Sequence, residues 1–242
     1  MANWSLLAAG TWTTNFATSL TPTDPGSYAA GDLLLCFTCV KEGVTLTVPG
    51  GWTRLSPAVN TQTSQVIGKI AASGSETMPA IGWGGGNVTQ MASCIAYRCS
   101  TGVPSLGSIV HASVDRVTTN TNNIVAPNGM SITVDNCLAL FWGMRINTGS
   151  ASTFTAINSM TNFTKRSEKQ DDSLHFTGIV GDWFQTTATT ITANAPAWSG
   201  TFNDGSQGTY SCFIALLAGV AAGNIGPTPW QDVGGMGSVV AM

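Results

Sequence analysis

Residues 31–40 read GDLLLCFTCV, and this stretch is apolar at nearly every position instead of at alternate ones. A strand with one face in water would alternate, so a continuous run indicates a strand that is covered on both faces. The run is too short for a membrane-spanning helix, which needs about 20 apolar residues. Turn residues precede it at residues 30–32 and follow it at residues 41–43. We therefore predict a central, fully covered strand.

A second run of the same character, DNCLALFWGM, occupies residues 135–144. Shorter segments after each run match in the same order, which is the mark of an internal repeat. We predict two pseudo-equivalent halves that form the two sheets of a sandwich. The alternative is that β-rich sequences share composition and match by chance. The matching segments are residues 51–54 with 162–165, 81–85 with 196–200, and 91–96 with 209–214.

The composition favours strands and turns over helices. Charged residues make up 9% of the 242 residues, against about a quarter in an average protein, and glycine occurs 28 times. Almost no segment combines helix-forming residues with helical spacing. We predict an all-β fold, an antiparallel and jelly-roll-like β-sandwich with an extended C-terminal arm. Its parts are an N-terminal strand segment at 1–27, the sandwich at 28–219 and a Gly/Pro-rich arm at 220–242.

The charge balance and the termini narrow the classes of partner. A net charge of −3 with scattered cations argues against nucleic acid, which attracts basic patches. The N-terminus lacks the pattern of a signal peptide, and no apolar run is long enough to span a bilayer. We expect a chain that is made in a cytoplasm and has no membrane partner. Its low surface charge indicates either a neutral, hydrated surface or one that is covered in an assembly, which we favour.

The cysteines are expected to be structural. Cys36 and Cys39 have the spacing of half a zinc site, but on a strand this spacing directs them to opposite faces. We predict that the cysteines are buried thiols that pack as small apolar groups, with Cys94 and Cys212 at matching core positions. The alternative is a disulfide, which could form only if the protein matures under oxidising conditions. No metal or cofactor is expected.

Catalytic patterns are scarce. The two histidines are His111 and His175, and neither lies in a Ser-His-Asp pattern or near a G-x-S-x-G elbow. His175 follows Asp171 and Asp172, which could form an acid–base or metal cluster but fits the edge of a loop better. We predict that the chain is not an enzyme, with a hydrolase as the least favoured function.

Three sets of residues are candidates for binding. The charged segment after residue 164 is predicted to be an exposed loop that contacts a partner or is simply solvated. Two tryptophans that precede Gly- or Ser-rich loops could stack on sugars, although a core position is favoured for both. The sets are the assembly contacts Trp4, Trp230, Val239 and Val240; the contact loop Lys165, Arg166, Glu168, Lys169, Asp171 and Asp172; and the glycan platforms Trp83 and Trp198.

Three short motifs carry a family resemblance: GDLLL at residues 31–35, PGGWT at 49–53 and AYR at 96–98. With the second apolar strand pair, they resemble a β-sandwich domain of tailed-phage and prophage structural proteins, over residues 28–219. Phe163 stands where that pattern has a tryptophan. The resemblance implies a virion protein, either an exposed capsid decoration or spike or a tail component. It implies capsid or tail proteins as partners and a homo-oligomer, and it carries over no catalytic residue. The alternative is a carbohydrate-binding module that attaches to a host surface glycan.

Overall fold

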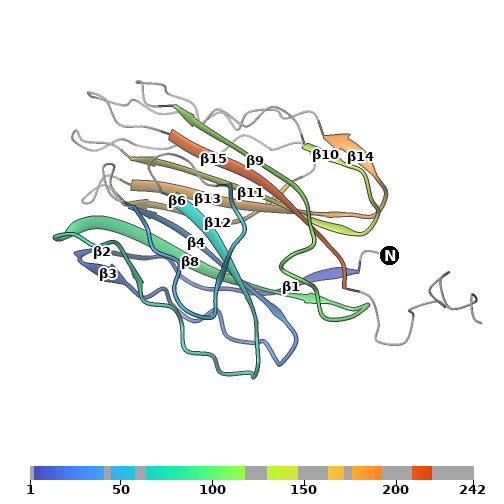
Figure 1. The fold of residues 1–242 in the computed structure, drawn as a ribbon, viewed down its shortest axis with the longest axis horizontal. Coiled ribbons are helices and arrows are strands. Elements are labelled where there is room, and N and C mark those ends of the chain that lie inside the picture. Colours follow the sequence, from blue (N-terminus) through green and yellow to red (C-terminus); the bar gives the residue numbers. More distant parts are fainter. Residues whose placement is uncertain are drawn as a thin grey trace, which may run out of the picture.

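The computed structural model describes residues 3–40, 45–57, 64–117, 130–146, 163–171, 176–191 and 209–219. These residues form β-strands and no helix, and their strand pairs are antiparallel. Two sheets lie face to face in two layers (Figure 1). The all-β, antiparallel sandwich is therefore confirmed. None of the described residues belongs to a helix that could cross a membrane.

Each sheet takes its strands from one half of the chain, so the jelly-roll-like path is not confirmed. The first sheet has the order β1-β8-β4-β6-β5, with β2 also paired to β8, and β3 pairs with β7 beside it. The strands are β1 (Trp4–Ala9), β2 (Thr13–Ala17), β3 (Ser19–Leu20), β4 (Leu33–Val40), β5 (Thr53–Arg54), β6 (Ser64–Ile70), β7 (Ile81–Gly82) and β8 (Val88–Cys99).

The second sheet has the order β12-β13-β11-β15-β9, and β10 pairs with β14 beside it. Its strands are β9 (Ile109–Val117), β10 (Met130–Ile132), β11 (Cys137–Ile146), β12 (Thr164–Asp171), β13 (Phe176–Gln185), β14 (Thr189–Ile191) and β15 (Thr209–Leu217).

The two sheets repeat one pairing scheme. Leu33 of β4 lies opposite Tyr97 of β8, and Leu138 of β11 lies opposite Leu216 of β15. Strand by strand, β1, β4, β5, β6 and β8 have β9, β11, β12, β13 and β15 as counterparts with the same neighbours. The prediction of two pseudo-equivalent halves is confirmed.

Irregularities are repeated as well. The pairing register skips Leu7 in β1 and Val110 in β9, at matching places of the two sheets. It skips Arg166 in β12, and at the counterpart place the amides of Leu55 and Ser56 both donate to one carbonyl of β6. Bulges are specific features of a strand pair. Their agreement makes chance matching of composition an inadequate explanation for the repeat.

The register corrects the residue-by-residue match of the two apolar runs. Matching residues 31–40 with 135–144 sets Leu33 against Cys137, but Leu33 faces the central core and Cys137 faces the opposite side of its sheet. A slip of one residue exchanges the faces of a strand. The counterpart of Leu33 is therefore Leu138. The match of residues 81–85 with 196–200 is also not supported, because the counterpart of β7 is β14 and residues 196–200 lie outside the described residues.

The central core lies between the sheets, and Trp142 of β11 is at its middle. Its ring lies 5.8 Å from that of Phe37 and stacks at 5.6 Å on Trp12. Its indole Nε1 donates to Ser64 Oγ of the first sheet at 2.7 Å. The core residues from the two runs are Leu33, Leu35, Phe37, Cys39, Leu138, Leu140, Trp142 and Met144.

The outer face of β4 is covered by the same chain. All of β4 is buried, and its outward side chains pack under Leu46, Trp52 and Trp83. The predicted cover on both faces is therefore confirmed. The cover on the outer face of this strand is supplied by the chain itself, which removes that face as a surface for a partner.

Cys36 and Cys94 lie directly opposite each other in β4 and β8 and form a disulfide, with a Cα–Cα distance of 4.3 Å. The prediction of buried thiols is wrong for this pair, because the register brings the two side chains together. It is confirmed for Cys39, Cys137 and Cys212. The match of Cys94 with Cys212 is wrong. Cys94 lies in the outer cluster, the buried residues on the outer face of the first sheet, whereas Cys212 lies in the central core.

Candidate functional site

The beginning and the end of the described chain lie together at one end of the sandwich (Figure 1). The Asn3 carbonyl accepts a hydrogen bond from the Ser100 amide at 2.7 Å. The Gly219 amide donates to Cys99 Sγ at 3.2 Å, and the Thr101 hydroxyl donates to the Gly219 carbonyl. We call this group, Asn3, residues 99–103 and Gly219, the terminal pole.

Gly219 fits the terminal pole because it has no side chain. A Cβ atom at this position would lie 2.5 Å from the carbonyl oxygens of both Gly102 and Val103. These are backbone atoms, so they cannot move aside as the end of a flexible side chain could. The strand β15 therefore ends against the turn after β8 in a fixed position, from which residues 220–242 continue.

Trp4 closes one side of the terminal pole. Its side chain is 4% exposed and its Nε1 donates to the Asn136 carbonyl at 3.3 Å. Asn136, which precedes β11, has a φ of 60°, and its counterpart Gly31, which precedes β4, has a φ of 90°. This burial leaves Trp4 no exposed ring, so its predicted role as an assembly contact is wrong.

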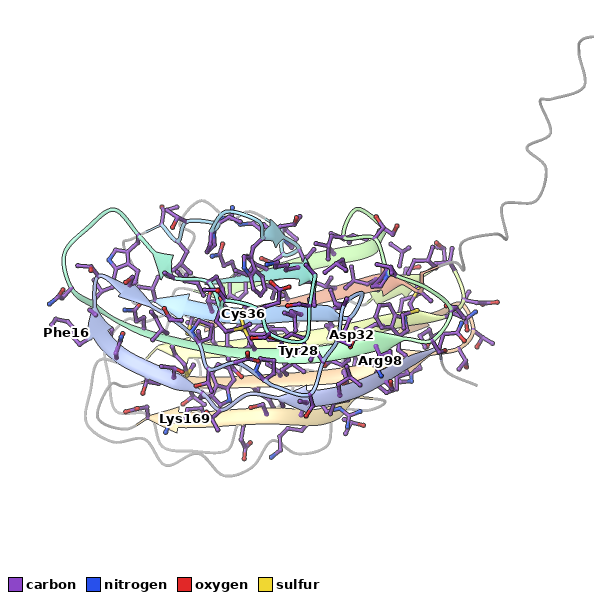
Figure 2. The ribbon with its side chains drawn as sticks, turned by 90° about the horizontal axis from the view of Figure 1, so that it is seen from below. Phe16, Tyr28, Asp32, Cys36, Arg98 and Lys169 are labelled. Atoms are coloured by element: carbon purple, nitrogen blue, oxygen red, sulfur yellow. A yellow bond between two sulfur atoms is a disulfide. The ribbon has the colours of Figure 1, made fainter. Side chains whose placement is uncertain are left out.

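A shallow hollow of about 260 Å³ lies beside the terminal pole. The buried Asp32 carboxylate accepts from Arg98 Nε at 2.8 Å and from Arg98 Nη2 at 2.7 Å, and these two residues lie together in Figure 2. Although burial alone would raise the pKa of Asp32, the Arg98 guanidinium and the Ala29 amide hold that pKa below its ordinary value. The hollow is lined by Ala30, Gly31, Asp32, Arg98, Cys99, Ser100, Gly102 and Val103.

The hollow has the chemistry of a contact surface. The Arg98 side chain is 48% exposed although its guanidinium is held by Asp32, and Val103 is 59% exposed. A held guanidinium beside an exposed apolar side chain can receive an apolar or aromatic group of a partner. Within the described ranges, no three His, Cys, Asp or Glu side chains gather as metal ligands. His175 lies outside the described residues.

The charged segment predicted as an exposed loop is a strand. Residues 164–171 form β12, an edge strand of the second sheet, and Lys169 lies along it in Figure 2. Lys165 pairs with Glu168 at 2.8 Å, and Asp171 accepts from Thr14 Oγ1 at 2.8 Å. Charges suit an edge strand because they discourage pairing with another chain. The predicted loop is therefore wrong, because these residues form a strand. Asp172 lies outside the described residues.

The predicted glycan platform at Trp83 is also wrong. The ring is 3% exposed within the outer cluster, and its Nε1 donates to the Gly86 carbonyl at 3.0 Å. A sugar cannot stack on a ring that the protein covers. The other predicted residues, Trp198, Trp230, Val239 and Val240, lie outside the described residues.

Neither the Asp32–Arg98 pair nor the role of Gly219 is predicted by the sequence patterns. Asp32 and Arg98 stand beside residues of the two central strands, and their opposition becomes visible once β4 and β8 are placed in register. Gly219 follows an apolar strand without any local signal of the turn that it contacts. No known protein family, no curated protein and no solved structure matches the chain.

Proposed function

We propose that the chain is a structural component of a tailed-phage virion that assembles through its termini. It is made in the host cytoplasm and becomes an exposed capsid decoration or a tail-associated protein. Its partners are capsid or tail proteins and further copies of itself. The observation that carries the proposal is the terminal pole, where both ends of the described chain leave the sandwich from fixed positions.

The covered faces of the sandwich support assembly through the termini. The central strand of the first sheet is covered by its own chain, and β12 presents charges along one edge of the second sheet. These surfaces offer little apolar area to a partner. The terminal pole instead presents Val103, and the hollow beside the pole presents Arg98, next to the origin of the arm at residues 220–242.

The composition of the arm fits a role in contacts. It contains Gly, Pro, Val and Met, with Asp232 as its one charged side chain and Trp230 as its one aromatic. A tryptophan supplies a large apolar area at an interface. We infer that Trp230, with Val239 and Val240, anchors the arm on a neighbour in the particle.

The first test compares the full chain with a chain that ends at residue 223, by light scattering over a range of concentrations. We expect the full chain to form oligomers and the shortened chain to be a folded monomer. A Trp230→Ala variant should weaken association, whereas a Trp83→Phe variant, altered inside the fold, should associate as the full chain does. Two equally stable monomers would refute assembly through the arm.

The second test asks whether the protein belongs to a particle. Phage particles released from the source are purified on a density gradient, and their proteins are identified by mass spectrometry. We expect peptides of this chain in the particle fractions, in a constant ratio to the major capsid protein. A chain that remains in the fractions without particles would refute the virion role.

The glycan-binding alternative has lost one of its two predicted tryptophan platforms. It now depends on Trp198 and on the surface of β12, because the Trp83 ring is covered. A glycan array with the Trp198→Ala variant separates the two functions. Binding that this variant abolishes would favour attachment, and absence of binding would count against it.

A further inference from the structure

The hollow beside the terminal pole presents a cation that is fixed in place. The Arg98 guanidinium donates to the buried Asp32 carboxylate through Nε and Nη2, and the Ala29 amide donates to the same carboxylate at 2.7 Å (Figure 2). These two bonds use only part of the N–H donors of the guanidinium. Among the described residues, its other N–H groups have no hydrogen-bond partner. Arg98 therefore offers a partner an oriented cation with free donors.

An exposed apolar side chain stands beside this cation. Val103 is 59% exposed, and a Cβ atom on Gly31 would lie 3.2 Å from its Cγ2, so its side chain lies over the bare backbone of Gly31. The hollow of about 260 Å³ is smaller than the pockets of about 300–1,000 Å³ that bind small molecules. It therefore suits one or two side chains of a protein better than a small-molecule ligand.

The arm at residues 220–242 has the complementary chemistry. Asp232 is its one charged side chain, and Trp230, two residues earlier, is its one aromatic side chain. A carboxylate accepts hydrogen bonds from a guanidinium, and an indole ring packs on a guanidinium face or on an apolar side chain. One short segment of the arm thus carries both groups that the hollow can receive.

The position of Gly219 separates the origin of the arm from the hollow of the same chain. Gly219 lies against the carbonyl oxygens of Gly102 and Val103 and is not a lining residue of the hollow, whereas the Val103 side chain faces Gly31. When extended, the segment from Gly219 to Trp230 can span up to about 36 Å, which is enough to reach a neighbour. Two copies that meet pole to pole about a twofold axis can therefore exchange their arms.

We propose that the hollow receives the arm of a second copy of this chain. Trp230 of one copy packs on Val103 and the Arg98 guanidinium of the other. Asp232 accepts hydrogen bonds from the free N–H groups of the same Arg98. This inference rests on the proposed function, because it names the neighbour to which the arm is anchored. The contact is reciprocal, so a dimer contains it twice.

The test changes one charge on each side of the contact in the full chain. Val103→Asp gives Arg98 a carboxylate from its own chain and repels Asp232 of the neighbour, and Asp232→Arg brings two cations together. Because like charges in contact oppose association, each variant alone should self-associate at least about tenfold more weakly in sedimentation velocity. The matched control, Val48→Asp, makes the same change at another exposed valine and should associate as the natural chain does.

A mixture of the two variants identifies the second copy as the occupant. In a mixed dimer, the new carboxylate of the Val103→Asp chain meets the new guanidinium of the Asp232→Arg chain, and the other contact is the natural one. We expect an equimolar mixture to associate within about threefold of the natural chain. If each arm filled the hollow of its own chain, mixing would restore nothing, and that result would overturn the proposal.

A measurement on the natural chain needs no substitution. Hydrogen exchange at residues 99–103 is followed below and above the concentration at which the chain associates. We expect slower exchange in the associated form, and equal exchange would contradict docking at the hollow.

The outcomes separate this proposal from assembly through the arm. If removal of the arm abolishes association but Val103→Asp does not weaken it, the arm binds elsewhere, so the hollow is wrong as its receptor while the proposed function stands. A natural chain that stays monomeric at every concentration would overturn both.

Discussion

Replacing Gly219 by alanine tests the terminal pole directly. The new methyl group would lie 2.5 Å from two backbone oxygens, so the end of β15 must move away from the turn after β8. The movement breaks two hydrogen bonds, from the Gly219 amide to Cys99 and from Thr101 to the Gly219 carbonyl. At about 1 kcal/mol each, the loss is about 2 kcal/mol. For a protein of this size, the melting temperature should fall by about 4–8 °C.

Urea unfolding measures the loss, and labelling of the half-buried Cys99 thiol reports where it occurs. We expect the variant to label faster at Cys99, because the segment that contacts its sulfur has moved. The matched control is Gly50→Ala, since a Cβ atom there meets nothing within 4 Å. A Gly219→Ala protein that unfolds at the same urea concentration as the natural one, with unchanged labelling, would refute the fixed exit of the chain.

Three further predictions concern the disulfide, one carboxylate and the thiols. Cys36→Ala should lower the free energy of unfolding by about 2–4 kcal/mol relative to the chain with the Cys36–Cys94 bridge, and equal stability in urea would contradict this bond. The folded pKa of Asp32 is lowered, so its contribution to stability is present above the unfolded pKa of about 4 and is lost as pH falls through the folded pKa. Asp32→Asn should therefore show a weaker acid dependence in melting curves between about pH 5 and pH 2, and an unchanged dependence would count against the ion pair. In the native protein, Cys99 should react with a thiol reagent before Cys212, because burial raises the pKa of Cys212 to about 12; the reverse order in peptide mapping would contradict the burial.

The sequence was sufficient for the central strand and for the repeat. Residues 33–40 have apolar side chains on both faces of a strand, which requires cover on both sides. The same reasoning could not align the two runs, because continuous apolar runs lack the alternation that marks which face is inner. Pairing register supplied that information, and it moved the counterpart of Leu33 from Cys137 to Leu138.

The candidate site was less predictable. Residues 164–171 are charged, which is typical of a loop, but an edge strand tolerates charge because one side of its backbone meets water. Trp4 and Trp83 were candidates for exposed contacts, although a tryptophan can be buried whenever its indole N–H finds a carbonyl. The Asp32–Arg98 pair depends on contacts between distant segments, and spacing along the chain does not encode it.

The repeat within one polypeptide lets each half change alone. In a dimer of identical chains, every substitution appears at both symmetric places and must be tolerated in each. Here the first half carries a cystine at Cys36 and Cys94, whereas the register of the second half sets Phe141 opposite Phe213 at that place. The crosslinked cysteines of one half and the two phenylalanine positions of the other can thus evolve independently. Damage by a reducing agent should consequently begin in one layer of the sandwich, while the other layer has no such bond at the equivalent place to lose.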